Sequence, residues 1–261
     1  MSEMPSIPDG RAVPVTVLTG FLGAGKTTLL NRILNGDHGL RVAVLVNDFG
    51  SINIDADLVV DVKSDVVSLA NGCVCCSIRG DLIEAVTSVL ERPEKPEYVL
   101  LEASGVADPS GIIMTFINPD LRNLIRLDSV TCVLDAEQVF AHPDYPALMD
   151  LKLRQIGFAD MMILNKVDLA GPEQVKKVRE WVDGSFNRLR IFETSHCDVP
   201  LEILLSVGRF DPARLDDENH DHDHDHLELF STWSYEMDQP ISLEVLREMV
   251  RKLPGNIYRV K

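Results

Sequence analysis

The feature that most constrains the fold is an eight-residue phosphate-binding pattern that directly follows the first apolar run of the chain. The segment Gly20-Phe-Leu-Gly23-Ala-Gly25-Lys26-Thr27 fits GxxxxGK[ST] at every position and opens a helical pattern. Glycines let such a loop wrap closely around phosphate oxygens, and the helix N-terminus adds partial positive charge. The pattern predicts a nucleoside triphosphate site, with Lys26 on the β- and γ-phosphates and Thr27 on Mg²⁺. The residues expected to contact the nucleotide are Gly20, Gly23, Ala24, Gly25, Lys26, Thr27 and Thr28.

Short apolar runs alternate with helical patterns as far as about residue 207, which predicts an α/β fold of the P-loop NTPase type with a doubly wound, mostly parallel sheet. Several runs are almost wholly apolar, as is typical of parallel strands covered on both faces. The expected strands are 13–18, 41–46, 65–69, 98–101, 129–134, 161–164 and 189–192. The expected helices between them are 26–34, 79–90, 110–117, 147–156 and 172–182.

Composition divides the chain into three parts. Residues 1–208 form the expected P-loop domain, which includes a cluster of cysteines. Residues 209–227 are acidic and histidine-rich with few apolar side chains, which favours a solvated linker. Residues 228–261 are typical of a strand, a helix over 241–253 and another strand, which predicts a partial C-terminal α+β segment too small to bury a core of its own.

A second nucleotide motif follows the sixth expected strand, where the chain reads Asn165-Lys166-Val167-Asp168. The Asp168 carboxylate can accept two N–H hydrogen bonds from guanine, whereas adenine has no matching pair of donors, so the motif predicts GTP. The alternative interpretation is that Asp168 only caps a helix. Ser195 follows the next strand and is a further candidate contact to the base.

Acidic residues near two other strand ends are candidates for catalysis. Glu102 ends the fourth strand and is expected to hold Mg²⁺, and the N–H of Gly105 can meet the γ-phosphate. Asp48 follows the second strand and can approach Mg²⁺, the attacking water or a second metal, unless the segment is an ordinary turn. The catalytic candidates are therefore Lys26, Thr27, Asp48, Glu102 and Gly105.

Three cysteines at CxCC spacing, Cys73, Cys75 and Cys76, follow the third expected strand. Thiolates at this spacing can converge on one soft ion, so the cluster predicts metal binding or redox use rather than inert packing, with Zn²⁺ or a related transition metal as the expected ion. Because Zn²⁺ prefers four ligands, the fourth is Asp48, another side chain, water or a partner.

The other metal-binding residue types are weaker candidates. Cys132 lies within an apolar strand and is expected in the core, and Cys197 is expected to be structural. Histidines alternate with aspartates in the linker at His220, His222, His224 and His226. They predict either weak binding of metal ions or a plain solvated segment.

Charge and hydropathy limit the partners and the location. With 25 Lys and Arg against 41 Asp and Glu, the net charge is −16, the wrong sign for a protein that binds nucleic acid. No apolar run approaches the ~18 residues that a membrane helix needs, so no membrane partner is expected. The acidic, proline-containing N-terminus does not fit a secretory signal, and a cytoplasmic location is expected.

The chain resembles the CobW-type P-loop GTPases, which are metal chaperones. The resemblance is carried by five segments in order, GFLGAGKTTLLNRIL, NDFG, NGCVCCSIRGDL, EASGVADP and ILNKVDL. The resemblance runs from about Pro14 to Ser195 and resumes at FSTWSYEMDQPISLEVLREMVRKLPGNIYRVK. It implies GTP hydrolysis coupled to binding Zn²⁺ or another transition metal through the CxCC thiols and delivering it to a client metalloprotein. Members of that family usually continue past this point, so residues 228–261 are expected to be the start of a C-terminal domain that is either truncated or unusually short.

Two other functions remain open from the residues alone. One is a metal-buffering or storage protein whose nucleotide only stabilises the fold, which GTP turnover would distinguish. The other is an ATP-dependent small-molecule kinase, which the guanine-type motif at Asp168 disfavours.

Overall fold

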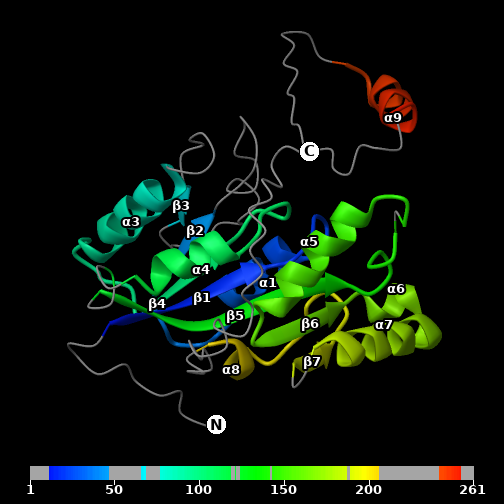
Figure 1. Ribbon diagram of the computed structural model, residues 1–261. Helices are drawn as coiled ribbons and strands as arrows, with labels where there is room; N and C mark the ends of the chain where they lie inside the picture. Colours follow the sequence, from blue (N-terminus) through cyan, green and yellow to red (C-terminus); the bar gives the residue numbers. More distant parts are fainter. Residues whose placement is uncertain are drawn as a thin grey trace.

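Seven parallel strands form one sheet in the order β3-β2-β4-β1-β5-β6-β7 (Figure 1). The computed structural model describes residues 12–46, 66–68, 77–118, 121, 124–141, 143–186, 189–205 and 241–253. The strands are β1 (Val13–Thr19), β2 (Val42–Val46), β3 (Val66–Ser68), β4 (Tyr98–Glu102), β5 (Ile125–Asp135), β6 (Met161–Asn165) and β7 (Arg190–Glu193). This arrangement confirms the predicted doubly wound α/β fold of the P-loop NTPase type.

Helices cover both faces of the sheet. The helices of the described residues are α1 (Lys26–Leu34), α3 (Ser77–Leu90), α4 (Ser110–Phe116), α5 (Pro146–Gly157), α6 (Val167–Ala170), α7 (Pro172–Ser185), α8 (Leu201–Leu204) and α9 (Leu243–Arg251), and α9 buries none of its residues. Successive strand residues point to opposite faces, so Val17 packs in one hydrophobic cluster with α3 and α4, whereas Leu18 packs in another with α1 and α8. A third cluster joins β5 and β6 to α5 and α7.

One strand differs from the sequence prediction for a clear physical reason. β5 begins at Ile125, not at Ser129, because the strand continues through a bulge at which the pairing with β1 skips Asp128. The Asp128 side chain is fully buried, and it accepts hydrogen bonds from the Tyr98 hydroxyl at 2.7 Å and from Arg126 at 2.9 Å. These donors allow an acid to lie inside a strand, a position that composition alone disfavours.

The remaining differences are at the ends of elements and in short helices. The sequence predicted neither α6 nor α8, because four residues are too few to show helical periodicity. The predicted C-terminal helix is present as α9, whereas the two strands expected on either side of it lie outside the described residues. None of the helices in the described part of the chain is long and apolar enough to cross a membrane.

Candidate nucleotide-binding site

The phosphate loop connects β1 to α1 in a backbone conformation that needs glycine. Gly20, Gly23 and Gly25 have φ values of 128°, 74° and 116°, all in the region that other residues rarely adopt. A Cβ atom on Gly20 would lie 2.1 Å from the carbonyl oxygen of Val133. One on Gly25 would lie 2.5 Å from Nδ2 of Asn165, so the loop is packed tightly against β5 and β6.

The lysine and threonine that end the motif occupy the first turn of α1. Lys26 is 5% exposed, and its ammonium group donates a hydrogen bond to the carbonyl of Phe21 at 3.3 Å, which folds the side chain back over the loop. The Thr27 hydroxyl donates to Oε1 of Glu102 at 2.9 Å. Glu102 ends β4, the neighbour of β1 in the sheet, and is 4% exposed.

Thr27 and Glu102 thus bring a hydroxyl and a carboxylate together beside the phosphate loop. Oxygen donors of these two kinds are the ligands that Mg²⁺ prefers, and Mg²⁺ keeps water in its remaining positions. The pair fits the metal role that the sequence predicted for both residues.

The turn after β4 lies directly on the phosphate loop. A Cβ atom on Gly105 would be 2.7 Å from Cδ2 and 2.9 Å from the backbone nitrogen of Leu22, so only glycine allows this approach. The N–H of Ala107 donates to the carbonyl of Ser104 at 3.1 Å and closes a turn around Gly105. Gly105 is therefore placed beside the loop that is expected to hold phosphate.

Asn165 ties the phosphate loop to the segment after β7. Its Nδ2 donates to the carbonyl of Ala24 at 2.9 Å, and its Oδ1 accepts from the N–H of Cys197 at 2.9 Å. Both ends of the amide are thus used within the protein, and the side chain is 3% exposed. In this structure Asn165 orders the two loops that flank the predicted base site.

The other residues of the predicted base site follow β6 and β7. Lys166 adopts a left-handed conformation with φ of 62°, and its ammonium group lies 2.6 Å from Oδ2 of Asp135. Asp168 lies in the first turn of α6 with its side chain exposed. Ser195 is partly exposed in the loop after β7. The structure therefore brings Asp168 and Ser195 to the carboxyl ends of neighbouring strands, where ligands of parallel sheets bind.

The two cysteines within the described residues are buried and protonated. Burial raises the pKa of the Cys132 thiol to about 12, although the charge of Lys26 acts in the opposite direction. Burial likewise raises the pKa of the Cys197 thiol to about 11, against the charges of Arg32 and Lys166. The predicted core role of Cys132 is confirmed by its burial. The predicted structural role of Cys197 is confirmed by its burial and by its Sγ, which lies 3.4 Å from the carbonyl oxygen of Gly25.

The predicted transition-metal residues lie outside the described part of the chain. Across the described ranges, no three His, Cys, Asp or Glu side chains gather in a way that could hold a metal ion. The predictions that fall outside are those for Asp48, for Cys73, Cys75 and Cys76, and for His220, His222, His224 and His226.

Sequence reasoning missed three polar residues that contact parts of the candidate site, Asp135 at Lys166, Lys152 at Phe21 and Gln155 at Gly105. Lys152 donates to the carbonyl of Val139 at 2.7 Å and lies 5.1 Å from the centroid of the Phe21 ring. Burial lowers the pKa of Lys152, and the charge of Asp135 opposes that shift. The available signal was the spacing of Lys152 and Gln155, which fall on the otherwise apolar stripe of α5.

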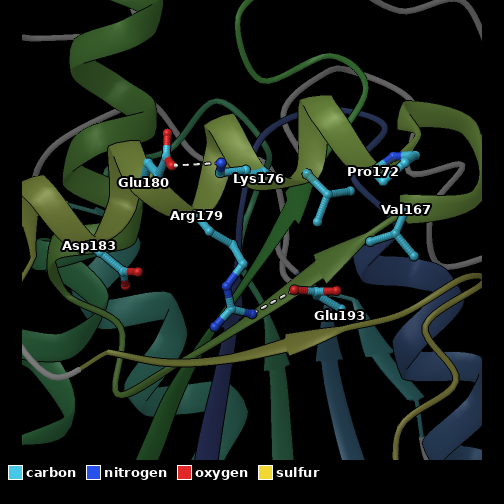
Figure 2. A pocket seen from close by; sticks show the side chains of 8 residues that line it. Val167, Pro172, Lys176, Arg179, Glu180, Asp183 and Glu193 are labelled. Atoms are coloured by element: carbon cyan, nitrogen blue, oxygen red, sulfur yellow. Dashed lines mark hydrogen bonds and ion pairs between the residues drawn. The ribbon is translucent and has the colours of Figure 1, made fainter.

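A separate pocket of about 600 Å³ lies between α7 and β7 (Figure 2). Its charged side chains largely pair with one another, as in the contact of Arg179 with Glu193 at 2.6 Å and that of Lys176 with Glu180 at 3.8 Å. None of the residues of the phosphate loop lines this pocket.

Comparison with known proteins gives a consistent result. The sequence model of the CobW/HypB/UreG nucleotide-binding domain matches residues 14–193. A zinc-regulated GTPase metalloprotein activator 1 of Dictyostelium discoideum is 35% identical over 234 residues, which cover 76% of this chain and 49% of that protein. The zinc chaperone YjiA of Escherichia coli K12 is 36% identical over 204 residues, which cover 76% of this chain and 62% of YjiA.

The chain therefore spans between about half and just under two thirds of the length of these two relatives. Among solved structures, the Zn(II)-bound YjiA GTPase from E. coli superimposes with a TM-score of 0.59 at 28% identity, covering 77% of this chain and 63% of that one.

Proposed function

Because the chain belongs to the CobW/HypB/UreG family of nucleotide-binding domains, we propose that it is a GTPase that binds Zn²⁺ or a related transition metal and delivers it to a client metalloprotein. The observation that carries the nucleotide part is the Thr27–Glu102 hydrogen bond beside the phosphate loop. It joins the two residues that a P-loop enzyme needs for Mg²⁺ at the carboxyl ends of adjacent strands.

Each residue of this site has a defined role in the proposal. Thr27 and Glu102 would hold Mg²⁺, which neutralises charge on the phosphates when bound. Lys26 adds a positive charge to the β- and γ-phosphates, and the Gly105 N–H meets the γ-phosphate. The glycines of the loop would let its backbone wrap closely around the phosphate oxygens.

The choice of guanine rests on the loops after β6 and β7. The exposed Asp168 carboxylate would accept the two N–H groups of the base. Lys166 bonds Asp135 and Asn165 bonds Ala24, which holds the backbone before Asp168 in place. Ser195, after β7, would contact the base from the neighbouring loop. Adenine lacks the donor pair and would leave the carboxylate unsatisfied, so GTP is favoured over ATP.

Turnover of the two nucleotides tests this part. With Mg²⁺ present, GTP hydrolysis is expected to be slow and to exceed ATP hydrolysis, because no arginine finger is evident in the sequence. Lys26→Ala should lower kcat/KM for GTP by about 100-fold or more, because a charged phosphate contact is lost. Asp168→Asn should weaken GTP binding by about 10- to 100-fold through loss of a charged acceptor.

The chain offers matched controls for both substitutions. Lys176→Ala and Asp183→Asn make the same chemical changes on α7, away from the phosphate loop, and should leave turnover unchanged. Equal use of ATP would favour the kinase alternative instead. Full activity of Lys26→Ala would show that the phosphate loop takes no part in the reaction.

The metal part of the proposal rests on the CxCC spacing of Cys73, Cys75 and Cys76, and on the zinc named for the relatives. Thiolates are soft ligands that select Zn²⁺ and similar ions, and an incompletely closed site suits transfer of the ion. Asp48 is the candidate fourth ligand within the chain. The histidines at His220, His222, His224 and His226 would add only weak sites.

A metal titration in the apo, GDP-bound and GTP-bound states tests the coupling of the two sites. If GTP and Zn²⁺ favour the same state, each should raise the affinity of the other by the same factor, about 5- to 150-fold for ordinary coupling energies. Replacing the three cysteines with serine should abolish tight Zn²⁺ binding and leave GTP binding nearly intact, because serine hydroxyls stay protonated and ligate poorly.

Replacing the four linker histidines with alanine is the control for the count of bound ions. That variant should keep one tight, GTP-sensitive ion and lose only weak ones. Metal affinity that is the same in all three nucleotide states would contradict delivery and would leave a metal buffer as the function.

A further inference from the structure

The buried face of α5 carries two polar side chains among apolar ones. Leu148, Leu151 and Ile156 pack into the core, and Lys152 and Gln155 lie on the same face with 3% and 1% of their surface exposed. Buried polar groups are unfavourable unless they are hydrogen-bonded, so both residues need partners. Lys152 donates to the carbonyls of Gln138 and Val139 in the turn after β5, whereas the partners of Gln155 lie in the turn after β4.

Gln155 holds the turn that follows β4. Its Nε2 donates to the carbonyl of Gly105 at 3.3 Å and to that of Ala107 at 3.1 Å. Its Oε1 is buried and has no hydrogen-bond partner within the described residues. This orientation of the amide places its two N–H donors on the turn and leaves Oε1 without a donor. The reverse orientation would place Oε1 against two carbonyl oxygens, which is unfavourable.

The turn that Gln155 holds touches the phosphate loop. Gly105 approaches Leu22 so closely that a Cβ atom would be 3.0 Å or less from three of its atoms. Glycine has wide conformational freedom, so its peptide orientation must be set by external contacts. Among the described residues the Gly105 N–H has no acceptor, which leaves it available to a ligand.

The same helix contacts the turn and the loop at other points. Arg154 lies 3.3 Å from Oδ2 of Asp108, whose Oδ1 accepts from the N–H of Ser110 at the start of α4. Lys152 lies over the ring of Phe21 in the phosphate loop. One helix thus connects the phosphate loop with both ends of the turn.

We propose that Gln155 is a positioning residue, which fixes the Gly105 turn against the phosphate loop so that the Gly105 N–H faces the γ-phosphate of GTP. This inference rests on the proposed function. Gln155 touches no part of the nucleotide itself and acts through the two carbonyls that it binds. Because GDP has no γ-phosphate, the role of Gln155 is specific to the triphosphate.

The variant Gln155→Met tests this role in the full chain, because methionine fills a similar volume and donates no hydrogen bond. Turnover of GTP and the dissociation constants of GDP and of a non-hydrolysable GTP analogue are measured with Mg²⁺. We expect kcat to fall by about 10- to 100-fold, as for small misplacements of a reacting group, and the analogue to bind more weakly. GDP affinity should change by less than about 2-fold, because no GDP contact depends on Gly105.

The control is Gln174→Met, because Gln174 on α7 also donates to a backbone carbonyl, that of Ala136, at 3.3 Å. It should leave the ratio of analogue to GDP affinity unchanged. Parallel weakening of GDP and the analogue in Gln155→Met would show a merely structural role and overturn the inference, as would unchanged kcat and an unchanged ratio.

A second variant decides the matter if Gln155→Met does not fold. Arg154→Met removes the contact with Asp108 from a side chain that is 24% exposed, and it should lower the ratio of analogue to GDP affinity in the same direction. An unchanged ratio there would overturn the inference. A wild-type protein that does not use GTP would overturn both proposals, whereas normal GTP turnover with an insensitive Gln155→Met would overturn this one alone.

Discussion

Asn165 shows how one side chain can order two loops at once. Sequence reasoning placed it at the nucleotide, as part of the motif that ends in Asp168. In the structure both ends of its amide form hydrogen bonds within the protein. Nδ2 donates to the carbonyl of Ala24 in the phosphate loop, and Oδ1 accepts from the backbone N–H of Cys197. The close approach of Gly25 to the same amide explains why a side chain is excluded there. The phosphate loop and the segment beside the predicted base site are thereby linked through a single residue.

Cysteine reactivity gives a prediction at the scale of single residues. The pKa of Cys197 is about 11 and that of Cys132 about 12, so at pH 8 only about one part in 1,000 or less of either is the reactive thiolate. In the metal-free native protein these two thiols should label slowly with a thiol reagent, and the rate should rise about tenfold per pH unit toward the pKa. Mass spectrometry of labelled peptides over time measures this.

The unfolded chain is the control, because all five cysteines should then label at similar rates. Cys73, Cys75 and Cys76 are predicted to label first in the native protein and to be protected by Zn²⁺. Fast labelling of Cys197 at pH 8 would contradict its burial against Gly25.

At the scale of elements, apolar periodicity predicted those helices and strands whose bounds are set by packing against a hydrophobic core. The bounds predicted for α1 match the structure, because its apolar spacing and the preceding glycines define its length and its start. The start of β5 was not predicted, because Asp128 is compatible with a buried strand only through hydrogen bonds from Tyr98, which is distant in sequence, and from Arg126, which is close to it. Long-range hydrogen bonds of this kind leave no local pattern in the sequence.

The same distinction applies to the candidate site. Lys26, Thr27 and Glu102 were predicted from motifs, because each motif carries its chemistry within a few consecutive residues. The contribution of α5 was not predicted, since Gln155 is 50 positions from Gly105 in the chain and only the fold brings them together. A polar residue on an apolar helical stripe was the one available sign, and it does not identify the partner.

At the scale of the whole molecule, the proposed nucleotide site draws on four strand ends of one parallel sheet. β1 supplies the phosphate loop, β4 supplies Glu102, β6 leads to Asp168 and β7 leads to Ser195. In the sheet order, β1 lies between β4 and β5, so the chain after β1 and the chain after β4 run to the site from neighbouring strands. A ligand that contacts all four segments would join parts of the domain that are far apart in sequence.

Such a ligand should stabilise the folded protein by mass action. At a concentration 100 times its dissociation constant, a ligand that binds only the folded state contributes about 2.7 kcal/mol to the free energy of unfolding. For a domain of this size that corresponds to an increase in Tm of about 5 to 11 °C. We therefore expect GDP with Mg²⁺ to raise the Tm of the wild type by that amount in a thermal unfolding experiment, and ADP at the same concentration to raise it little.

Lys26→Ala should lose most of the increase and Lys176→Ala should retain it, because only Lys26 belongs to the phosphate loop. An equal increase with ADP and GDP would mean that the loops after β6 and β7 do not distinguish the bases, and it would separate the phosphate site from the predicted guanine site.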